Sequence, residues 1–206
     1  MSENLQNRER TGWFTAARVF AKAMTTLFFP IRYHGLENAE QIDAPFILIA
    51  NHRHWMDPMT VGNVVNRYET RWLGKKEIGQ NKIARYVVTK LHMIMVDRHN
   101  TDLTAMRESV KTVRDGHVLG IFPEGTRCKG EPMAHLETGA AYIALRCKAP
   151  LLPVFVEKPL KLWKKTNIYI GKPFLPDDIY RKGSNNETAD ELLQAMREHV
   201  LNAKES

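Results

Sequence analysis

From residue 46 onward, short apolar runs alternate with longer amphipathic segments, and this alternation restricts the possible folds more than any other feature of the chain. The runs at 46–50 and 118–122 are almost continuously apolar, which is the pattern of strands that a sheet buries on both faces. Strands of this kind occur mainly in parallel sheets. The predicted strands are Phe46–Ala50, Arg71–Leu73, Met93–Val96, Val118–Phe122, Leu152–Val156 and Ile168–Ile170.

The segments between these strands have the apolar spacing of helices. Parallel strands that alternate with helices form an α/β fold, in which residues with chemical roles gather in loops beyond the carboxyl ends of the strands. We therefore expect an α/β fold with a mainly parallel sheet of about six or seven strands covered by helices. The predicted helices are Pro58–Asn66, Lys82–Leu91, Asp102–Arg114, Leu136–Cys147 and Glu187–Ala203.

The length and composition fit one folded domain with appendages. The chain has 206 residues, of which 43% are hydrophobic and 26% charged, and these values exclude a largely disordered chain or a fibrous rod. It is too short for a (β/α)₈ barrel of about 250 residues. Cys128 and Cys147 could form at most one disulfide, which a domain with a full core does not need, so we expect reduced thiols in a cytosolic setting.

The N-terminal segment is apolar on most of a helical projection of residues 11–29. Its polar residues form one narrow stripe, and the rest of its surface includes Trp13, Phe20 and Phe28. This pattern predicts an amphipathic helix that lies in a membrane interface. A first helix packed into the core is the alternative, and we expect neither a signal peptide nor a membrane span. The stripe consists of Thr15, Arg18, Lys22 and Thr25.

The net charge of +7 is concentrated in two regions. Residues 67–98 carry eight basic side chains against three acidic ones, and residues 158–172 add five lysines. Beside an interfacial helix, such charge suits anionic lipid headgroups, so an anionic membrane surface is a predicted partner. A merely solvated face is the alternative. Nucleic acid is not an expected partner, because no nucleic-acid-binding motif accompanies the charge.

The segment after the first predicted strand places an imidazole beside a carboxylate. His52 follows Asn51 at the strand end, and Asp57 precedes Pro58 where the next helix is predicted to begin. A carboxylate that accepts a hydrogen bond from one imidazole nitrogen leaves the other nitrogen free as a general base. The same carboxylate could also cap the helix, since aspartate before proline is typical of a helix start, and the two roles are compatible.

A second polar segment follows the strand at 118–122. Within one turn it contains a carboxylate, a glycine, a hydroxyl and a guanidinium, which together suit a polar ligand. Gly125 permits close backbone approach, and Arg127 offers the planar set of donors that binds phosphate. Arg98, at the end of another predicted strand, is expected to share an anion with Arg127. A surface turn with a Glu–Arg pair is the alternative.

These segments, in this order, resemble the glycerolipid acyltransferases typified by the 1-acyl-sn-glycerol-3-phosphate (lysophosphatidate) acyltransferases. The resemblance spans roughly residues 45 to 160. The family's Asn-His-x₄-Asp block is similar to Asn51, His52 and Asp57. The other three blocks are similar to Met93–Arg98, Phe122–Arg127 and Leu152–Val154. Together with the amphipathic pattern of the N-terminal segment, the resemblance leads us to expect an N-terminal amphipathic membrane-associating segment at 1–30 and an acyltransferase domain at 31–206.

The resemblance also implies a reaction and its residues. A fatty acyl group would pass from acyl-CoA or acyl-carrier protein to the sn-2 hydroxyl of 1-acyl-sn-glycerol-3-phosphate, giving phosphatidate at the cytosolic face of a membrane. His52 would be the general base and Asp57 its partner. No metal or other cofactor is expected, and no acyl-enzyme, because the chain lacks a Gly-x-Ser-x-Gly turn. The residues expected to bind the acceptor are Arg98, Glu124, Gly125, Thr126 and Arg127.

Three other functions remain open at this stage. The acceptor could be another lysophospholipid or a lyso-aminolipid, with the same mechanism. The pair His52 and His54 could belong to a zinc hydrolase, although the spacing of the residues that follow does not match a metallo-β-lactamase. A lipid-binding module without catalysis is the third, and it would have no reason to retain both His52 and Asp57.

Overall fold

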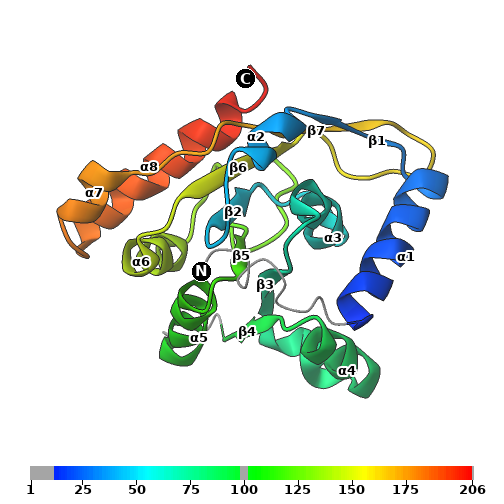
Figure 1. The fold of residues 1–206 in the computed structure, drawn as a ribbon, viewed down its shortest axis with the longest axis horizontal. Helices are drawn as coiled ribbons and strands as arrows, with labels where there is room; N and C mark the ends of the chain where they lie inside the picture. The colour runs from blue at the N-terminus through cyan, green and yellow to red at the C-terminus, as the bar shows by residue number, and fades with distance from the viewer. Residues whose placement is uncertain (1–11, 98–101, 206) are drawn as a thin grey trace, which may run out of the picture.

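The computed structural model describes residues 12–97 and 102–205, and within them seven strands form one sheet in the order β1-β7-β6-β2-β5-β3-β4 (Figure 1). Neighbouring strands are parallel except for β6 and β7, which are antiparallel. The prediction of a mainly parallel α/β sheet of about six or seven strands is therefore confirmed. The strands are β1 Ile31–His34, β2 Ile47–Ala50, β3 Thr70–Lys75, β4 Ile94–Val96, β5 Val118–Ile121, β6 Leu151–Val156 and β7 Thr166–Ile170.

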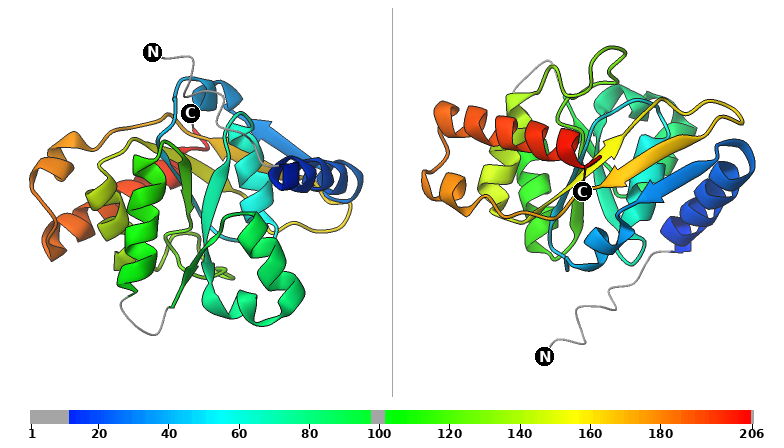
Figure 2. Two further views of the ribbon diagram at one scale, coloured as in Figure 1. Left: turned by 60° about the horizontal axis from the view of Figure 1, so that its bottom comes forward. Right: turned by 90° about the horizontal axis from the view of Figure 1, so that it is seen from above.

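Helices cover both faces of the sheet, as the two views in Figure 2 show. The central strands β2 and β5 are buried throughout, which explains why their sequences are apolar at every position. Short 3₁₀ helices follow α3 and β3, at Asn63–Val65 and Lys76–Gln80. The α-helices are α1 Gly12–Phe28, α2 Leu36–Glu40, α3 Asp57–Gly62, α4 Lys82–Lys90, α5 Leu103–Arg114, α6 Thr138–Cys147, α7 Asp177–Arg181 and α8 Asn186–Asn202.

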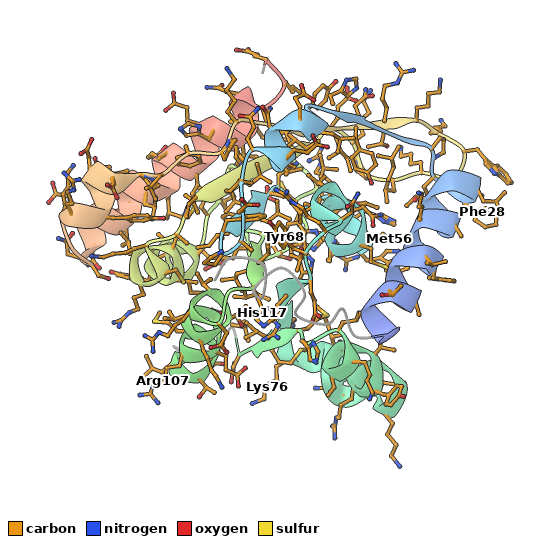
Figure 3. All side chains as sticks on the ribbon, viewed as in Figure 1. Phe28, Met56, Tyr68, Lys76, Arg107 and His117 are labelled. Carbon is orange, nitrogen blue, oxygen red and sulfur yellow. The ribbon has the colours of Figure 1, made fainter. Side chains whose placement is uncertain are left out.

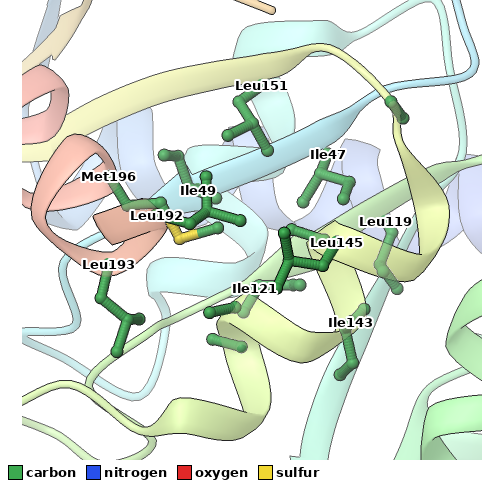
Figure 4. Close-up of a cluster of buried hydrophobic side chains, with 14 of the residues drawn as sticks. Ile47, Ile49, Leu119, Ile121, Ile143, Leu145, Leu151, Leu192, Leu193 and Met196 are labelled. Carbon is green, nitrogen blue, oxygen red and sulfur yellow. The ribbon is translucent and has the colours of Figure 1, made fainter. Parts of the chain in front are cut away.

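The alternation of side chains along β2 divides the core into two clusters. Ile47 and Ile49 belong to the cluster on one face, and Leu48 belongs to the cluster on the other face, with α2 and α3. Because successive side chains of a strand point to opposite faces, one strand supplies both clusters. Figure 4 shows part of the first cluster, in which β2, β5 and β6 pack against α6 and α8 through Ile47, Ile49, Leu119, Ile121, Ile143, Leu145, Leu151, Leu192, Leu193 and Met196.

Some elements differ from the prediction. The strand at 31–34 and the short helices α2 and α7 are additional elements, each of only four or five residues. The helix predicted at 58–66 is an α-helix up to Gly62 and a 3₁₀ helix from Asn63 to Val65. Cys128 and Cys147 are free thiols, as expected. Burial raises the pKa of the Cys147 thiol to about 12.

The helix α1 lies along one side of the molecule, next to α3 (Figure 1). Val19, Phe20 and Leu27 are each at least 60% exposed, so these residues do not pack into the core. Thr25 is buried, with its hydroxyl donating to the carbonyl of Lys22. No helix in residues 12–97 and 102–205 is both long enough and apolar enough to cross a membrane.

The strand order brings the two polar segments together. β2 and β5 are parallel neighbours, so the loops after their carboxyl ends leave the sheet at the same edge. The loop after β2 begins at Asn51 and the loop after β5 begins at Phe122. The sheet therefore places His52 beside the segment 122–127.

Candidate functional site

His52 and Asp57 form a hydrogen-bonded pair in the loop between β2 and α3. The Nδ1 atom of His52 lies 2.9 Å from Oδ2 of Asp57. The Asp57 side chain is fully buried, whereas the His52 side chain is 16% exposed. A neutral imidazole whose Nδ1–H donates to a carboxylate has its lone pair on Nε2. The geometry thus leaves Nε2 as the nitrogen able to accept a proton.

The Asp57 carboxylate is oriented by the loop that contains His52. Its Oδ2 also accepts hydrogen bonds from the backbone N–H groups of Arg53, at 2.5 Å, and His54, at 2.6 Å. The interpretation of Asp57 as a helix cap is wrong, because the N-cap of α3 is Met56 and no side chain caps it. The carboxylate instead points back to the loop, where charge-assisted bonds hold it against His52.

The backbone of His52 is held by the loop after β5. Its N–H donates to Oε2 of Glu124 at 2.5 Å, and its carbonyl accepts from the N–H of Cys128 at 2.8 Å. Both main-chain polar groups of His52 are therefore bound by the loop after β5. These two bonds fix the main chain from which the imidazole extends toward Asp57.

Glu124 is a buried link between two loops. Its side chain is 5% exposed, and its Oε1 accepts the N–H of Met133 at 2.7 Å while Oε2 accepts that of His52. Burial raises the pKa of the Glu124 carboxyl, and the two backbone donors partly oppose this effect. The contacts of Glu124 thus fix the main chain at His52 and Met133. Its expected contact with an acceptor stays a prediction.

The ring of His52 rests on a column of aromatic side chains that sequence reasoning missed. It stacks on Phe122 with ring centroids 4.2 Å apart, and Phe122 stacks on Trp72 at 4.6 Å. Trp72 lies opposite Gly120 in the β3–β5 ladder, and a Cβ on Gly120 would lie 2.5 Å from the indole. A glycine inside an otherwise apolar strand was the available signal, since it indicates close approach by another group.

Asn51 extends the pairing of β2 and β6 beyond the last strand residue. Its amide donates to the carbonyl of Val156 at 2.9 Å and accepts the N–H of the same residue at 2.7 Å. The side chain is fully buried, so these bonds satisfy an amide that would otherwise destabilise the core. Asn51 thereby secures the strand end from which His52 leaves the sheet.

The remaining predicted binding residues differ in how much the structure says of them. Gly125 has φ = +65°, a conformation that favours glycine, and a Cβ there would lie 2.6 Å from Cγ of Glu137, so the Glu137 side chain would have to shift. Thr126 and Arg127 are exposed. Arg127 is near enough to His54 to contribute to the lowering of the His54 pKa, whose main cause is burial. Arg98 lies outside the described residues.

The second histidine of the loop takes part in the local turn. Nδ1 of His54 accepts the N–H of Met56 at 3.3 Å, and the His54 ring lies beside Phe29 and Trp55. Within the described part of the chain, no three His, Cys, Asp or Glu side chains are grouped closely enough to hold a metal ion.

Comparisons with known proteins identify the family. Residues 30–157 match the sequence model of the family described as Acyltransferase. The 1-acyl-sn-glycerol-3-phosphate acyltransferase of Bacillus subtilis (strain 168) is 29% identical over 184 residues, which cover 87% of this chain and 90% of that protein. The enzyme of the same name from Streptococcus pneumoniae (strain ATCC BAA-255 / R6) is 26% identical over 161 residues, covering 75% of this chain and 59% of that protein.

A solved structure supports the fold. The crystal structure of the 1-acyl-sn-glycerophosphate acyltransferase PlsC from Thermotoga maritima superposes with a TM-score of 0.69 and 22% identity, covering 93% of this chain and 78% of that one. The family model covers more than half of the chain, including both polar segments. The chain therefore belongs to the acyltransferase family, as the resemblance of its motifs predicted, and is an O-acyltransferase.

Proposed function

We propose that the protein transfers a fatty acyl group from acyl-CoA or acyl-carrier protein to the sn-2 hydroxyl of 1-acyl-sn-glycerol-3-phosphate, giving phosphatidate. The observation that carries this proposal is the hydrogen bond of 2.9 Å between His52 and the buried carboxylate of Asp57. The names of the relatives from Bacillus subtilis and Streptococcus pneumoniae support the acceptor. Another lysophospholipid or a lyso-aminolipid is the alternative acceptor.

His52 acts as the general base in the proposed reaction. Its Nε2 takes the proton of the acceptor hydroxyl while the hydroxyl oxygen attacks the thioester carbonyl carbon. The buried negative charge of Asp57 stabilises the imidazolium that forms. Collapse of the tetrahedral intermediate breaks the carbon–sulfur bond, and the imidazolium returns its proton to the thiolate. No acyl-enzyme forms, and base catalysis of this type contributes about 10²- to 10⁴-fold to the rate.

The acceptor phosphate is proposed to bind at the exposed end of the second polar segment. Arg127 offers paired N–H donors, and Gly125, Thr126 and Arg98 complete the binding site. The fully buried Asp57 and the nearly buried Glu124 do not compete with the phosphate for the Arg127 guanidinium, because their carboxylates face main-chain donors. A phosphate bound there would lie at the carboxyl ends of β2 and β5, the same edge of the sheet at which His52 lies.

An acceptor panel tests this assignment. With one labelled acyl thioester, Arg127→Ala should raise the KM for lysophosphatidate by about 10- to 100-fold, the effect of losing charge-assisted hydrogen bonds. The KM for an uncharged acceptor such as a monoacylglycerol should not change. Arg181→Ala is the matched control, because this arginine is exposed on α7 and pairs only with Asp177 among the described residues. A preference of the wild type for acceptors without phosphate would contradict the proposal.

Glu124 is proposed to act through His52. Glu124→Gln replaces one carboxylate oxygen with an NH₂ group that opposes an N–H donor, so one backbone donor of His52 or Met133 loses its partner. An unpaired buried donor costs about 1–3 kcal/mol, and we expect kcat to fall about 10- to 100-fold with little change in the acceptor KM. A raised acceptor KM with unchanged kcat would instead favour direct acceptor binding by Glu124.

The enzyme is proposed to work as a peripheral protein on the cytosolic face of a membrane. The exposed Val19, Phe20 and Leu27 of α1 support this assignment, since they give the helix an uncovered apolar surface. The net charge of +7 favours anionic lipid. Phe29, just after α1, lies with its ring centroid 6.1 Å from that of His54, so the helix ends near the catalytic loop.

A further inference from the structure

The loop between β6 and β7, residues 157–165, carries two large apolar side chains at its tip. Leu162 is 51% exposed and Trp163 is 70% exposed, the latter among the most exposed large hydrophobic residues in the described chain. The N–H of Lys164 donates to the carbonyl of Lys161 at 3.0 Å, closing a tight turn around the pair. Trp163 has φ = +56°, a conformation that tryptophan rarely adopts, so the turn holds it there.

A backbone hydrogen bond attaches this loop to the end of α1, because the N–H of Trp163 donates to the carbonyl of Phe28 at 2.8 Å. Directly after the loop, the N–H of Thr166 at the start of β7 donates to the carbonyl of Pro30, between α1 and β1, at 3.1 Å. Both views in Figure 2 show the loop beside α1, and Figure 3 labels Phe28 at the contact. The tip of the loop is thus held next to the helix that exposes Val19, Phe20 and Leu27.

The charge around the tip favours an anionic partner. Residues 157–165 contain one acidic residue, Glu157, and four exposed lysines. Tryptophan prefers the interface between hydrocarbon and headgroups, and each lysine near an anionic surface contributes about 1 kcal/mol to membrane binding. An acidic protein could also pair with the lysines. Lipid fits better, because the exposed Leu–Trp pair lies next to the exposed apolar surface of α1. The lysines are Lys158, Lys161, Lys164 and Lys165.

We propose that the β6–β7 loop is a second membrane anchor, which inserts Leu162 and Trp163 into the interface of an anionic bilayer beside α1. This inference rests on the proposed peripheral function and extends it. Two attached anchors restrict the orientation of the protein on the bilayer more than one helix does. Because the end of α1 lies near His54, the restricted orientation keeps the catalytic loop close to the lipid acceptor.

The test is sedimentation of the full chain with vesicles of equal parts phosphatidylcholine and phosphatidylglycerol, without substrates. The variant Leu162→Ser/Trp163→Asn uses asparagine because this residue tolerates positive φ. We expect its partition onto the vesicles to fall at least tenfold. Leu175→Ser is the matched control, since Leu175 is equally exposed, at 49%, in the segment before α7, and should partition like the wild type.

The lysines are tested separately. Lys161→Gln/Lys164→Gln/Lys165→Gln should weaken binding to the mixed vesicles and flatten its dependence on salt, because fewer charges face the headgroups. Binding to vesicles of phosphatidylcholine alone should not change. Both loop variants should unfold at a temperature close to that of the wild type, which verifies that they fold independently of activity. Their rate with a short-chain, water-soluble lysophosphatidate should also stay at the wild-type level.

Three results would overturn the proposal. Unchanged partition of Leu162→Ser/Trp163→Asn would remove the loop from the membrane interface. If this variant keeps its partition but has a raised KM for acyl-carrier protein, the loop docks a protein. If the variant changes its oligomeric state, the loop is a contact between copies of the chain. Vesicle binding is measured without substrates, so it does not depend on the proposed reaction. If the wild type acylates no lysophospholipid while the loop variant loses its partition, the proposed function is refuted and this inference stands.

Discussion

Replacing His52 with alanine is expected to lower kcat by about 10²- to 10⁴-fold, the contribution that a positioned general base makes to such a reaction. The loss should fall on kcat, because the imidazole acts on the proton of the bound acceptor and is not needed to bind either substrate. Transfer of a labelled acyl group from a thioester to lysophosphatidate measures it. The two backbone bonds of His52 do not involve its side chain, so the alanine variant should keep the loop arrangement.

His199→Gln is the matched control for this substitution. His199 lies on α8 and stacks on Phe174, away from the loops after β2 and β5. The activity of the His199→Gln variant should equal that of the wild type. The His52 variant should also bind vesicles and unfold at a temperature close to that of the wild type. An unchanged rate of acyl transfer would remove His52 from the mechanism.

Asp57→Asn is expected to lower kcat by about 10²- to 10⁴-fold as well, because the neutral amide no longer stabilises the imidazolium. The amide oxygen can take the place of Oδ2 and accept the same three donors. The amide NH₂ would then occupy the place of Oδ1, which is buried without a hydrogen-bond partner among the described residues. We therefore also expect a loss of stability of about 1–3 kcal/mol, measured by denaturant unfolding.

Asp43→Asn serves as the control for the change of carboxylate to amide. Asp43 is 78% exposed and pairs with Arg67 at the surface, a contact worth at most about 1 kcal/mol. This variant should match the wild type in kcat and nearly match it in stability. If Asp57→Asn unfolds like the wild type and keeps its kcat, the carboxylate neither steers the imidazole nor supports the loop.

The strands around the site could be predicted from the sequence because burial on both faces leaves a local signal. Every residue of β2, β5 and β6 is buried, so each strand is an apolar run without alternation. β1 lacks this signal, since it lies at the sheet edge and no residue of Ile31–His34 is fully buried. Its pairing with β7 joins residues more than 130 positions apart, which no local pattern reveals.

The pair His52 and Asp57 was predictable for a similar reason, because Asp57 comes only five positions after His52 in one loop. The supporting contacts were not. The Glu124 carboxylate reaches a backbone N–H that is 72 residues away in sequence, and Trp72 reaches the site only because β3 and β5 are neighbours. These contacts depend on strand order, which composition and periodicity do not determine. The turn that presents Trp163 also depends on a contact with α1, 135 residues earlier.

A double-variant cycle of kcat tests the central claim most directly, that Asp57 acts through the imidazole of His52. The four proteins are the wild type, His52→Ala, Asp57→Asn and the variant with both substitutions. If the carboxylate serves only the imidazole, its replacement has no further effect once His52 is absent, so the double variant should have the kcat of His52→Ala. A double variant in which the two losses multiply would show that the residues act independently and would contradict the account.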